Sequence, residues 1–147
     1  MSIPLFLYHG SPYLLNKIEP KKAIGQNTNE SLYAIYASEI YDWVIPFALP
    51  IRWYPDNPSG KRIFECNAGK TKIIIGSINP HGIGYVYKLR AIDFKKIDEW
   101  QWISIQSIIP EEIFEVKVSD YWNTIEFSEE AKRINNELYG LYDNNVL

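Results

Sequence analysis

The chain has 147 residues, of which 46% are hydrophobic and 15% aromatic, and its formal net charge is −3 at pH 7. The hydrophobic content excludes an intrinsically disordered chain, and the length is that of one domain with a single substantial core. The acidic balance argues against a protein that binds nucleic acid through a basic surface. We therefore expect a single domain over residues 1–147.

The cysteine content and the N-terminal sequence indicate in which cellular compartment the protein is expected. Cys66 is the only cysteine, so no internal disulfide can form, and its alternating sequence context predicts a small hydrophobic residue of a strand. The N-terminus shows neither a basic region nor a long apolar stretch, so neither a signal peptide nor a transmembrane span is predicted. We expect a cytoplasmic protein without a membrane partner.

Strands and helices alternate in the first half of the chain. The apolar run over 5–9 predicts a strand, and Ser11-Pro12 then predicts the start of a short helix. A second apolar run predicts a strand over 32–37. Ser38 is the expected N-cap of the following helix, over 39–48, which its internal proline should kink or end.

The second half of the chain is mostly strand. A hairpin turn is expected at 67–70, another turn at 79–82, and a C-terminal helix capped by Ser128. The strands predicted in this half cover 61–66, 71–77, 85–89, 100–105 and 113–118. This order predicts an α+β fold with a mainly antiparallel or mixed sheet in the second half.

Several common ligand-binding motifs are incomplete. Gly69-Lys70-Thr71 is similar to the end of a P-loop, but Phe64 stands where that motif needs its first glycine. Gly82-Ile83-Gly84 lacks the third glycine of the dinucleotide fingerprint. No pair of histidines has the spacing of metal ligands, so no metal is expected, and His81 in a Pro-Gly turn is expected at the surface.

Three short segments remain as candidates for a functional site. They are Tyr8-His9-Gly10-Ser11 after an apolar run, Ala34–Ser38 where a strand meets a helix, and Asp98-Glu99-Trp100 before a late strand. A histidine followed by glycine can hold a flat polar ligand, because glycine lets backbone amides approach and histidine supplies a directed donor or acceptor. Each segment also has an ordinary interpretation: a turn, a packed aromatic residue and a solvated run of charges.

The order and spacing of the three segments resemble the ADP-ribosyltransferase superfamily, most closely its His-Tyr-Glu branch, which includes poly(ADP-ribose) polymerases and diphtheria toxin. In that branch a first strand ends in His-Gly-Ser or His-Gly-Thr, a later strand reads like Ile-Tyr-Phe-Ala, and a third begins at Asn-Glu-Tyr. The matching residues are His9-Gly10-Ser11, Ile35-Tyr36-Ala37 with Ser38, and Asp98-Glu99-Trp100, which span about two thirds of the chain.

The resemblance implies an α+β fold with split antiparallel or mixed sheets, a few flanking helices, and a cleft that takes NAD as a substrate. His9 would hold a hydroxyl of the adenosine-side ribose, and the Gly10 backbone would meet the nicotinamide carboxamide. Tyr36 would stack on the nicotinamide ring, and Glu99 would hydrogen-bond the nicotinamide ribose. The implied catalytic residues are Glu99, His9 and Tyr36, and the implied NAD-binding residues are His9, Gly10, Ser11, Tyr36 and Ser38.

These residue types suit the chemistry. Cleavage of the bond between nicotinamide and ribose develops an oxocarbenium-like cation, which a nearby carboxylate stabilises. An aromatic face holds a flat cationic ring. The position of the acid remains open, since a related branch reads Glu-x-Glu or Gln-x-Glu with catalysis at the second acid. In that register Gln101 occupies the catalytic position, and further acids follow at Glu111, Glu112 and Glu115.

Two functions therefore follow from the sequence. The first is an enzyme that cleaves NAD and transfers ADP-ribose to a protein, nucleic acid or small molecule, or that only hydrolyses NAD. The second is a non-catalytic ligand- or protein-binding domain of the same fold, such as a bacterial or phage accessory protein. The related RNA 2′-phosphotransferases fit poorly, because they need several arginines to hold phosphate and this chain has few.

Overall fold

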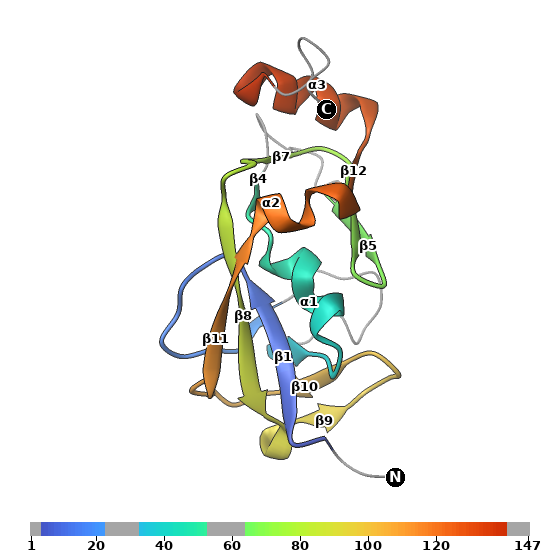
Figure 1. Cartoon of the computed structure of the whole chain (residues 1–147). Helices are drawn as coiled ribbons and strands as arrows, with labels where there is room; N and C mark the ends of the chain where they lie inside the picture. The colour runs from blue at the N-terminus through green and yellow to red at the C-terminus, as the bar shows by residue number, and fades with distance from the viewer. Residues whose placement is uncertain (1–3, 23–32, 53–63, 141–147) are drawn as a thin grey trace.

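The computed structural model describes residues 4–22, 33–52 and 64–140, and its elements form several small sheets with three α-helices in those ranges (Figure 1). The first sheet has the order β1-β8-β11, with β1 Phe6–Ser11, β8 Ile83–Arg90 and β11 Glu112–Lys117. The second has the order β2-β3-β10-β9, with β2 Lys21–Lys22, β3 Tyr33–Ala37, β10 Trp102–Ser104 and β9 Lys95–Lys96. All pairings in both sheets are antiparallel.

The remaining sheets are smaller. One has the order β12-β6-β5, with β12 Ile125–Phe127, β6 Lys70–Ile73 and β5 Phe64–Asn67, and its β12–β6 pair is parallel. The other pairs β4 Ile51–Arg52 with β7 Ser77–Ile78. The helices are α1 Tyr41–Ala48, α2 Val118–Tyr121 and α3 Glu129–Tyr139, with short 3₁₀ turns η2 Ala91–Asp93 and η3 Trp122–Thr124. The expected α+β class is confirmed.

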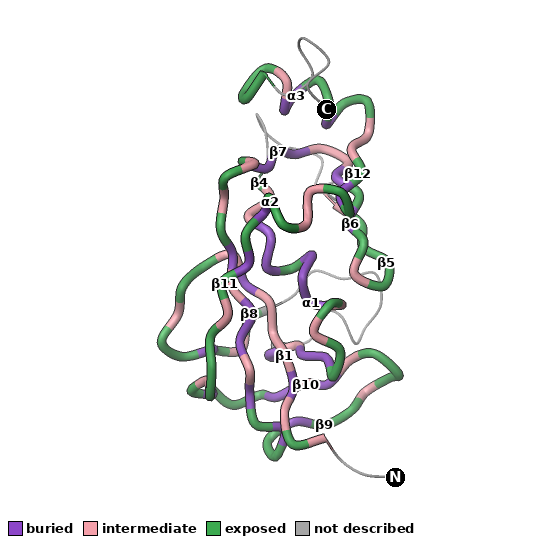
Figure 2. Tube along the Cα trace, in the orientation of Figure 1, coloured by how far each residue is buried: buried purple, intermediate pink, exposed green. Residues whose placement is uncertain are grey.

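The first sheet lies between α1 and the second sheet. Because side chains alternate along a strand, β1 and β8 present different residues to these two neighbours. One face of the sheet contributes Leu7, Tyr87 and Leu89 to a core shared with the second sheet. The other face contributes Val86 and Val116 to a core shared with α1. Figure 2 shows the buried segments gathered in α1, β8 and around β10, whereas β5 is exposed.

Two glycines let α1 lie directly on this sheet. A Cβ atom added to Gly84 would stand 1.6 Å from the Ala48 carbonyl oxygen, and one added to Gly10 would stand 2.3 Å from the Val44 carbonyl oxygen. No side chain fits in that space, so the backbone of α1 rests on the backbones of β1 and β8. Close packing against α1 is therefore enough to explain why residue 10, in the His-Gly pair, is glycine.

The helix α1 continues through Pro46 and ends at Ala48. A proline has no N–H, so the Asp42 carbonyl loses its usual partner one turn later. The β5–β6 hairpin turn lies against this carbonyl, since a Cβ added to Gly69 would stand 2.7 Å from the Asp42 oxygen. Ala68 and Gly69 both have positive φ, as a type I′ turn requires. The hairpin predicted at 67–70 is thereby confirmed.

The prediction of a helix beginning at Pro12 is wrong. Residues 12–17 form bends and irregular chain without helix, and the Tyr87 hydroxyl hydrogen-bonds two of their backbone groups. This hydroxyl accepts a hydrogen bond from the Leu15 N–H at 2.7 Å and donates one to the Tyr13 carbonyl at 2.5 Å. A long-range side chain thus replaces the hydrogen bonds that a helix would have made. Burial raises the pKa of the Tyr87 hydroxyl, so it stays protonated and can donate.

Three smaller expectations also need correction. Cys66 lies in β5 but is exposed, so it does not act as a buried hydrophobic residue. The strand expected over 71–77 is divided into β6 and β7. Ser38 is not the N-cap of α1, because Ile40 occupies that position and no side chain caps the helix. The first residues of the strands expected over 32–37 and 61–66 lie outside the described residues.

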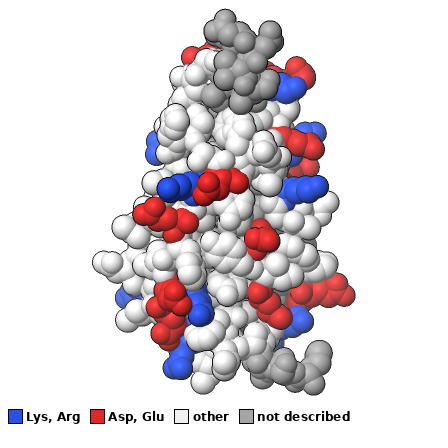
Figure 3. All heavy atoms as spheres, in the orientation of Figure 1, with Lys and Arg blue, Asp and Glu red and all other residues white. Residues whose placement is uncertain are grey.

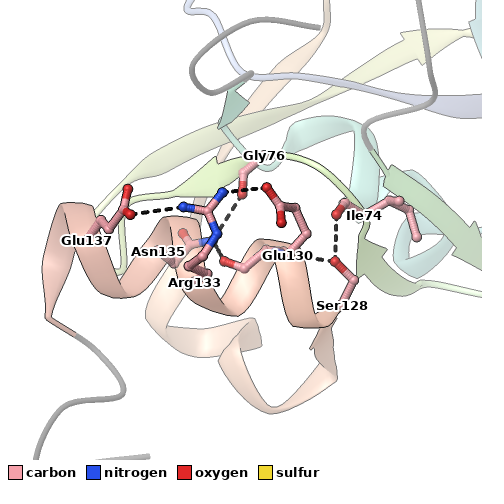
Figure 4. A network of polar contacts seen from close by, with 8 residues as sticks. Ile74, Gly76, Ser128, Glu130, Arg133, Asn135 and Glu137 are labelled. Carbon is pink, nitrogen blue, oxygen red and sulfur yellow. Dashed lines mark hydrogen bonds and ion pairs between the residues drawn. The ribbon is translucent and has the colours of Figure 1, made fainter. Parts of the chain in front are cut away.

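Hydrogen bonds connect α3 to the chain around β6 and β7 (Figure 4). Ser128 caps the helix by accepting the Ala131 N–H at 3.0 Å, and its hydroxyl donates to the Ile74 carbonyl at 2.5 Å. The buried Asn135 side chain accepts the Ile78 N–H and donates to the Gly76 carbonyl. The predicted Ser128 cap is confirmed. None of the helices in the described ranges is long and apolar enough to span a membrane.

Candidate functional site

The His9 ring points from β1 toward the second sheet. Its Nδ1 lies 2.7 Å from the Tyr36 carbonyl oxygen, and a carbonyl can only accept, so Nδ1 carries the hydrogen. Burial lowers the pKa of His9, an effect that outweighs the hydrogen bond to Tyr36 and is reinforced by the positive charge of Lys21. The ring is therefore neutral near pH 7, and Nε2 is a hydrogen-bond acceptor.

The other ring nitrogen of His9, Nε2, is the atom that a ligand would have to reach. It has no hydrogen-bond partner within the described ranges. It is also not a fully enclosed atom, since Thr71 Oγ1 is the only fully enclosed side-chain polar atom without a partner in those ranges. A ligand hydroxyl or amide that reaches Nε2 would therefore find a free acceptor.

A pair of backbone hydrogen bonds joins β1 to the end of β3. The Tyr8 N–H donates to the Ser38 carbonyl at 2.8 Å, and the Ser38 N–H donates to the Tyr8 carbonyl at 2.9 Å. The backbone groups of Tyr8 therefore point away from β8. Those of Gly10, two residues later, point to the same side, because the direction alternates along an antiparallel strand. The Gly10 N–H and C=O thus form one donor and one acceptor along the edge of β1 where β3 joins it.

The other predicted NAD-binding residues lie at or just after the ends of β1 and β3. Tyr36 is half-buried on the face of β3 opposite to the core residues Ile35 and Ala37. Ser11 and Ser38 are buried, and each hydroxyl accepts the N–H of the residue two positions later, at 3.1 Å and 3.2 Å. These two serines therefore shape the turns after β1 and β3.

The third segment forms the turn between β9 and β10. The Asp98 carboxylate accepts the N–H groups of Trp100 and Gln101, at 2.7 Å and 2.8 Å. The Trp100 ring contacts the Trp43 ring of α1, with 4.3 Å between their centroids. Just beyond the turn, the Trp102 indole donates to a Glu39 carboxylate oxygen at 3.1 Å. The turn is thus fastened to the start of α1.

The first and third segments therefore both contact residues 36–43, a stretch that begins in the second segment and ends in α1. β1 reaches this stretch through His9 and through the pairing of Tyr8 with Ser38, and the β9–β10 turn reaches it through two tryptophans. Sequence patterns do not single out Glu39 and Trp43, which hold the third segment in place. The only signal is the spacing of Trp100 and Trp102, which puts one indole at each contact.

The sheet register distinguishes Glu99 from Gln101. Ile103 is paired with Tyr36, so both side chains lie on the same face of the second sheet. Continuing the alternation of β10 by two residues places the half-buried Gln101 on this face too. Glu99 lies two residues farther, exposed in the turn. Of the two candidates for the acid position, the one nearer to Tyr36 along this face is therefore the amide Gln101 and not the acid Glu99.

The other candidate acids lie elsewhere. Glu111 forms an ion pair with Arg90, and Glu112 forms one with Lys88, each at 3.2 Å. Glu115 is exposed on β11. In the first sheet β8 separates β11 from β1, so these glutamates do not join His9. His81 is exposed in its turn, as expected.

Comparisons with protein-family models, curated proteins and solved structures give no match. Within the described ranges, no group of three or more His, Cys, Asp or Glu side chains could hold a metal ion. The function proposed below therefore depends on the residues and geometry of this chain.

Proposed function

We propose that the chain is an NAD-binding protein of the ADP-ribosyltransferase type. The observation that carries this proposal is that the first and third motif segments both contact residues 36–43, where the second segment leads into α1. Each segment has an ordinary structural interpretation when considered alone. A chance match to three short motifs would not require the first and the third to contact the same short stretch of chain at the second.

The polar groups at this junction complement NAD. A carboxamide has one carbonyl acceptor and an amino donor, and the Gly10 backbone offers the matching N–H and C=O. The neutral His9 ring offers Nε2 to a ribose hydroxyl. The Tyr36 ring is half-buried and supplies an aromatic surface for the nicotinamide ring.

The proposed reaction breaks the bond between the nicotinamide nitrogen and C1′ of the ribose. Nicotinamide leaves with the bonding electron pair and becomes neutral, and a positive charge develops on the ribose. Water or an acceptor then attacks C1′ and releases a proton. Glu99 is the carboxylate of the third segment that would stabilise the developing charge.

A second candidate function is NAD binding without cleavage. It is favoured by the register of β10, which puts the Gln101 amide on the Tyr36 face and Glu99 in the exposed turn. An amide can hydrogen-bond a ribose hydroxyl but carries no charge with which to stabilise a cation. The two candidates share the binding site and differ only in the acid.

Nicotinamide release from NAD tests both candidates. If the chain is an enzyme that uses Glu99, the wild type releases nicotinamide, and Glu99→Gln slows release about 100-fold. If it only binds NAD, the wild type releases none, and Gln101→Glu gives measurable release. A wild type that neither binds nor cleaves NAD would contradict both proposals.

A further inference from the structure

The strand β11 is an open edge of the first sheet. It stands at the end of the strand order β1-β8-β11, and Figure 1 shows it as the outer strand of that sheet. Within the described ranges, no strand or loop forms a backbone hydrogen bond with its outer side. An open edge presents a row of unpaired N–H and C=O groups, which another strand can join.

The pairing with β8 determines which backbone groups of β11 face outward. The Val118 N–H, directly after β11, donates to the Gly82 carbonyl at 3.0 Å, in the same register that pairs β11 with β8. The direction of the backbone groups alternates along an antiparallel strand. The N–H and C=O groups on the open side of β11 are therefore those of Ile113, Glu115 and Lys117.

The side chains of Glu115 and Lys117 give this open side a charge pattern that complements itself. Both residues are exposed, and they lie on the same face of the sheet because they are two positions apart. Neither forms an ion pair with a described residue. Figure 3 shows acidic and basic side chains interspersed on the side of the molecule where β11 lies. Such a mixture suits a surface with the same mixture better than it suits a polyanion.

We propose that β11 pairs antiparallel with β11 of a second copy of this chain, about a two-fold axis at Val116. In this register Glu115 of each copy lies directly opposite Lys117 of the other, so the interface has two identical ion pairs. Each of these residue pairs also exchanges both of its backbone hydrogen bonds. The three-stranded sheets of the two copies then form one continuous sheet. This association uses the edge opposite to β1, which carries His9, and does not depend on NAD.

The charges of β11 also exclude the neighbouring registers. Charged residues on an edge strand usually oppose pairing, and like charges directly opposite each other destabilise a strand pair. An axis at Glu115 would bring two carboxylates face to face, and an axis at Lys117 would do the same with two ammonium groups. An axis at Phe114 would place Ile113 opposite Glu115 and form no ion pair between the strands. The axis at Val116 is therefore the register that the sequence of β11 favours.

Sedimentation equilibrium of the whole chain over a series of concentrations tests this association. We expect a reversible dimer that Glu115→Lys and Lys117→Glu each weaken about 10-fold, because either change turns both ion pairs into like-charge contacts. The double variant with both changes exchanges the charges and should dimerise within about 3-fold of the wild type. Glu126→Lys alters the net charge as much as Glu115→Lys does, at an exposed position of β12, and should leave dimerisation unchanged.

Amide hydrogen exchange followed by NMR tests the register. Exchange at Glu115 and Lys117 should slow as the protein concentration rises, whereas exchange at Ile113, which lies outside the paired residues, should not. Slower exchange at Ile113 and Glu115, with Lys117 unchanged, would place the axis at Phe114 and overturn the proposal. A chain that stays monomeric up to about 1 mM, or a dimer that neither charge reversal weakens, would also overturn it.

Discussion

His9 uses its two ring nitrogens for different purposes. The Nδ1 atom connects β1 to β3 through the Tyr36 carbonyl, a structural task, whereas Nε2 is left for a ligand. Sequence alone identifies His9 as a candidate but does not separate these tasks, because the tautomer depends on a partner 27 residues away in the chain.

Substitution of His9 by asparagine separates the two tasks. The asparagine amide can still donate to the Tyr36 carbonyl, as Nδ1 does, but it has no equivalent of Nε2. We expect His9→Asn to unfold in urea within about 1 kcal/mol of the wild type while its NAD affinity falls about 10-fold. Loss of stability with unchanged NAD affinity would show that His9 has only a structural role.

The lowered pKa of His9 predicts how stability depends on pH. The unfolded chain has its His9 pKa near 6.5, and the folded chain has a lower value, so the unfolded state binds more protons between the two values. The free energy of unfolding should therefore fall as the pH drops below the unfolded value, by at most about 1.4 kcal/mol per pH unit from this group. The free energy of unfolding should stop falling once the pH is below the His9 pKa of the folded chain. Urea titrations over a pH series check this, and His9→Asn should lack this component of the pH dependence.

At the scale of elements, the position of α1 decides the geometry of the site. This helix begins just after the junction with β1, and two glycines of the first sheet let it lie against the strands. Its first turn also carries Trp43, which holds the β9–β10 turn. Displacement of α1 would therefore move both sides of the candidate site.

The Gly84→Ala substitution tests the contact between α1 and the sheet. The added Cβ would stand 1.6 Å from the Ala48 carbonyl oxygen, so helix or strand must move. We expect the free energy of unfolding to fall by about 3 kcal/mol or more. Gly140→Ala has open space around it but a φ of 65°, and should cost only about 1 kcal/mol. Equal costs in urea unfolding would contradict the tight contact.

The attachment of α3 is tested by Asn135→Ala. This change leaves the Ile78 N–H and the Gly76 carbonyl without their partner in a buried environment. We expect a loss of about 3 kcal/mol in the free energy of unfolding. Asn123→Ala, at an exposed asparagine of η3, should change it by less than about 0.5 kcal/mol. A small effect of Asn135→Ala would show that the apolar contacts of α3 suffice.

Elements governed by local chemistry could be predicted from the sequence. The Ser128 cap, the hairpin turn around Gly69 and the longer strands β1, β3, β8, β10 and β11 follow from neighbouring residues, whereas the two-residue strands β2 and β9 carry no local pattern. The helix expected from Pro12 failed because the Tyr87 hydroxyl, contributed by a distant strand, binds the backbone there. The prediction for Cys66, which is exposed, failed because alternation predicts a strand without saying which of its two faces is covered.

At the scale of the whole molecule, the sequence supplies the order of the three motif segments but not their meeting point. That meeting point depends on the pairing of Tyr8 with Ser38 and on the contact of Trp100 with Trp43, both between residues far apart in the chain. The register of β10, which favours Gln101 over Glu99 on the Tyr36 face, is likewise a property of strand pairing.

A calorimetric titration of the whole chain with NAD tests the central claim most directly. We expect saturable binding by the wild type, about 10-fold weaker binding by His9→Asn, and unchanged binding by His81→Asn, which alters the only other histidine. Absence of saturable binding, or equal affinity in all three proteins, would contradict an NAD site at the junction of β1 and β3.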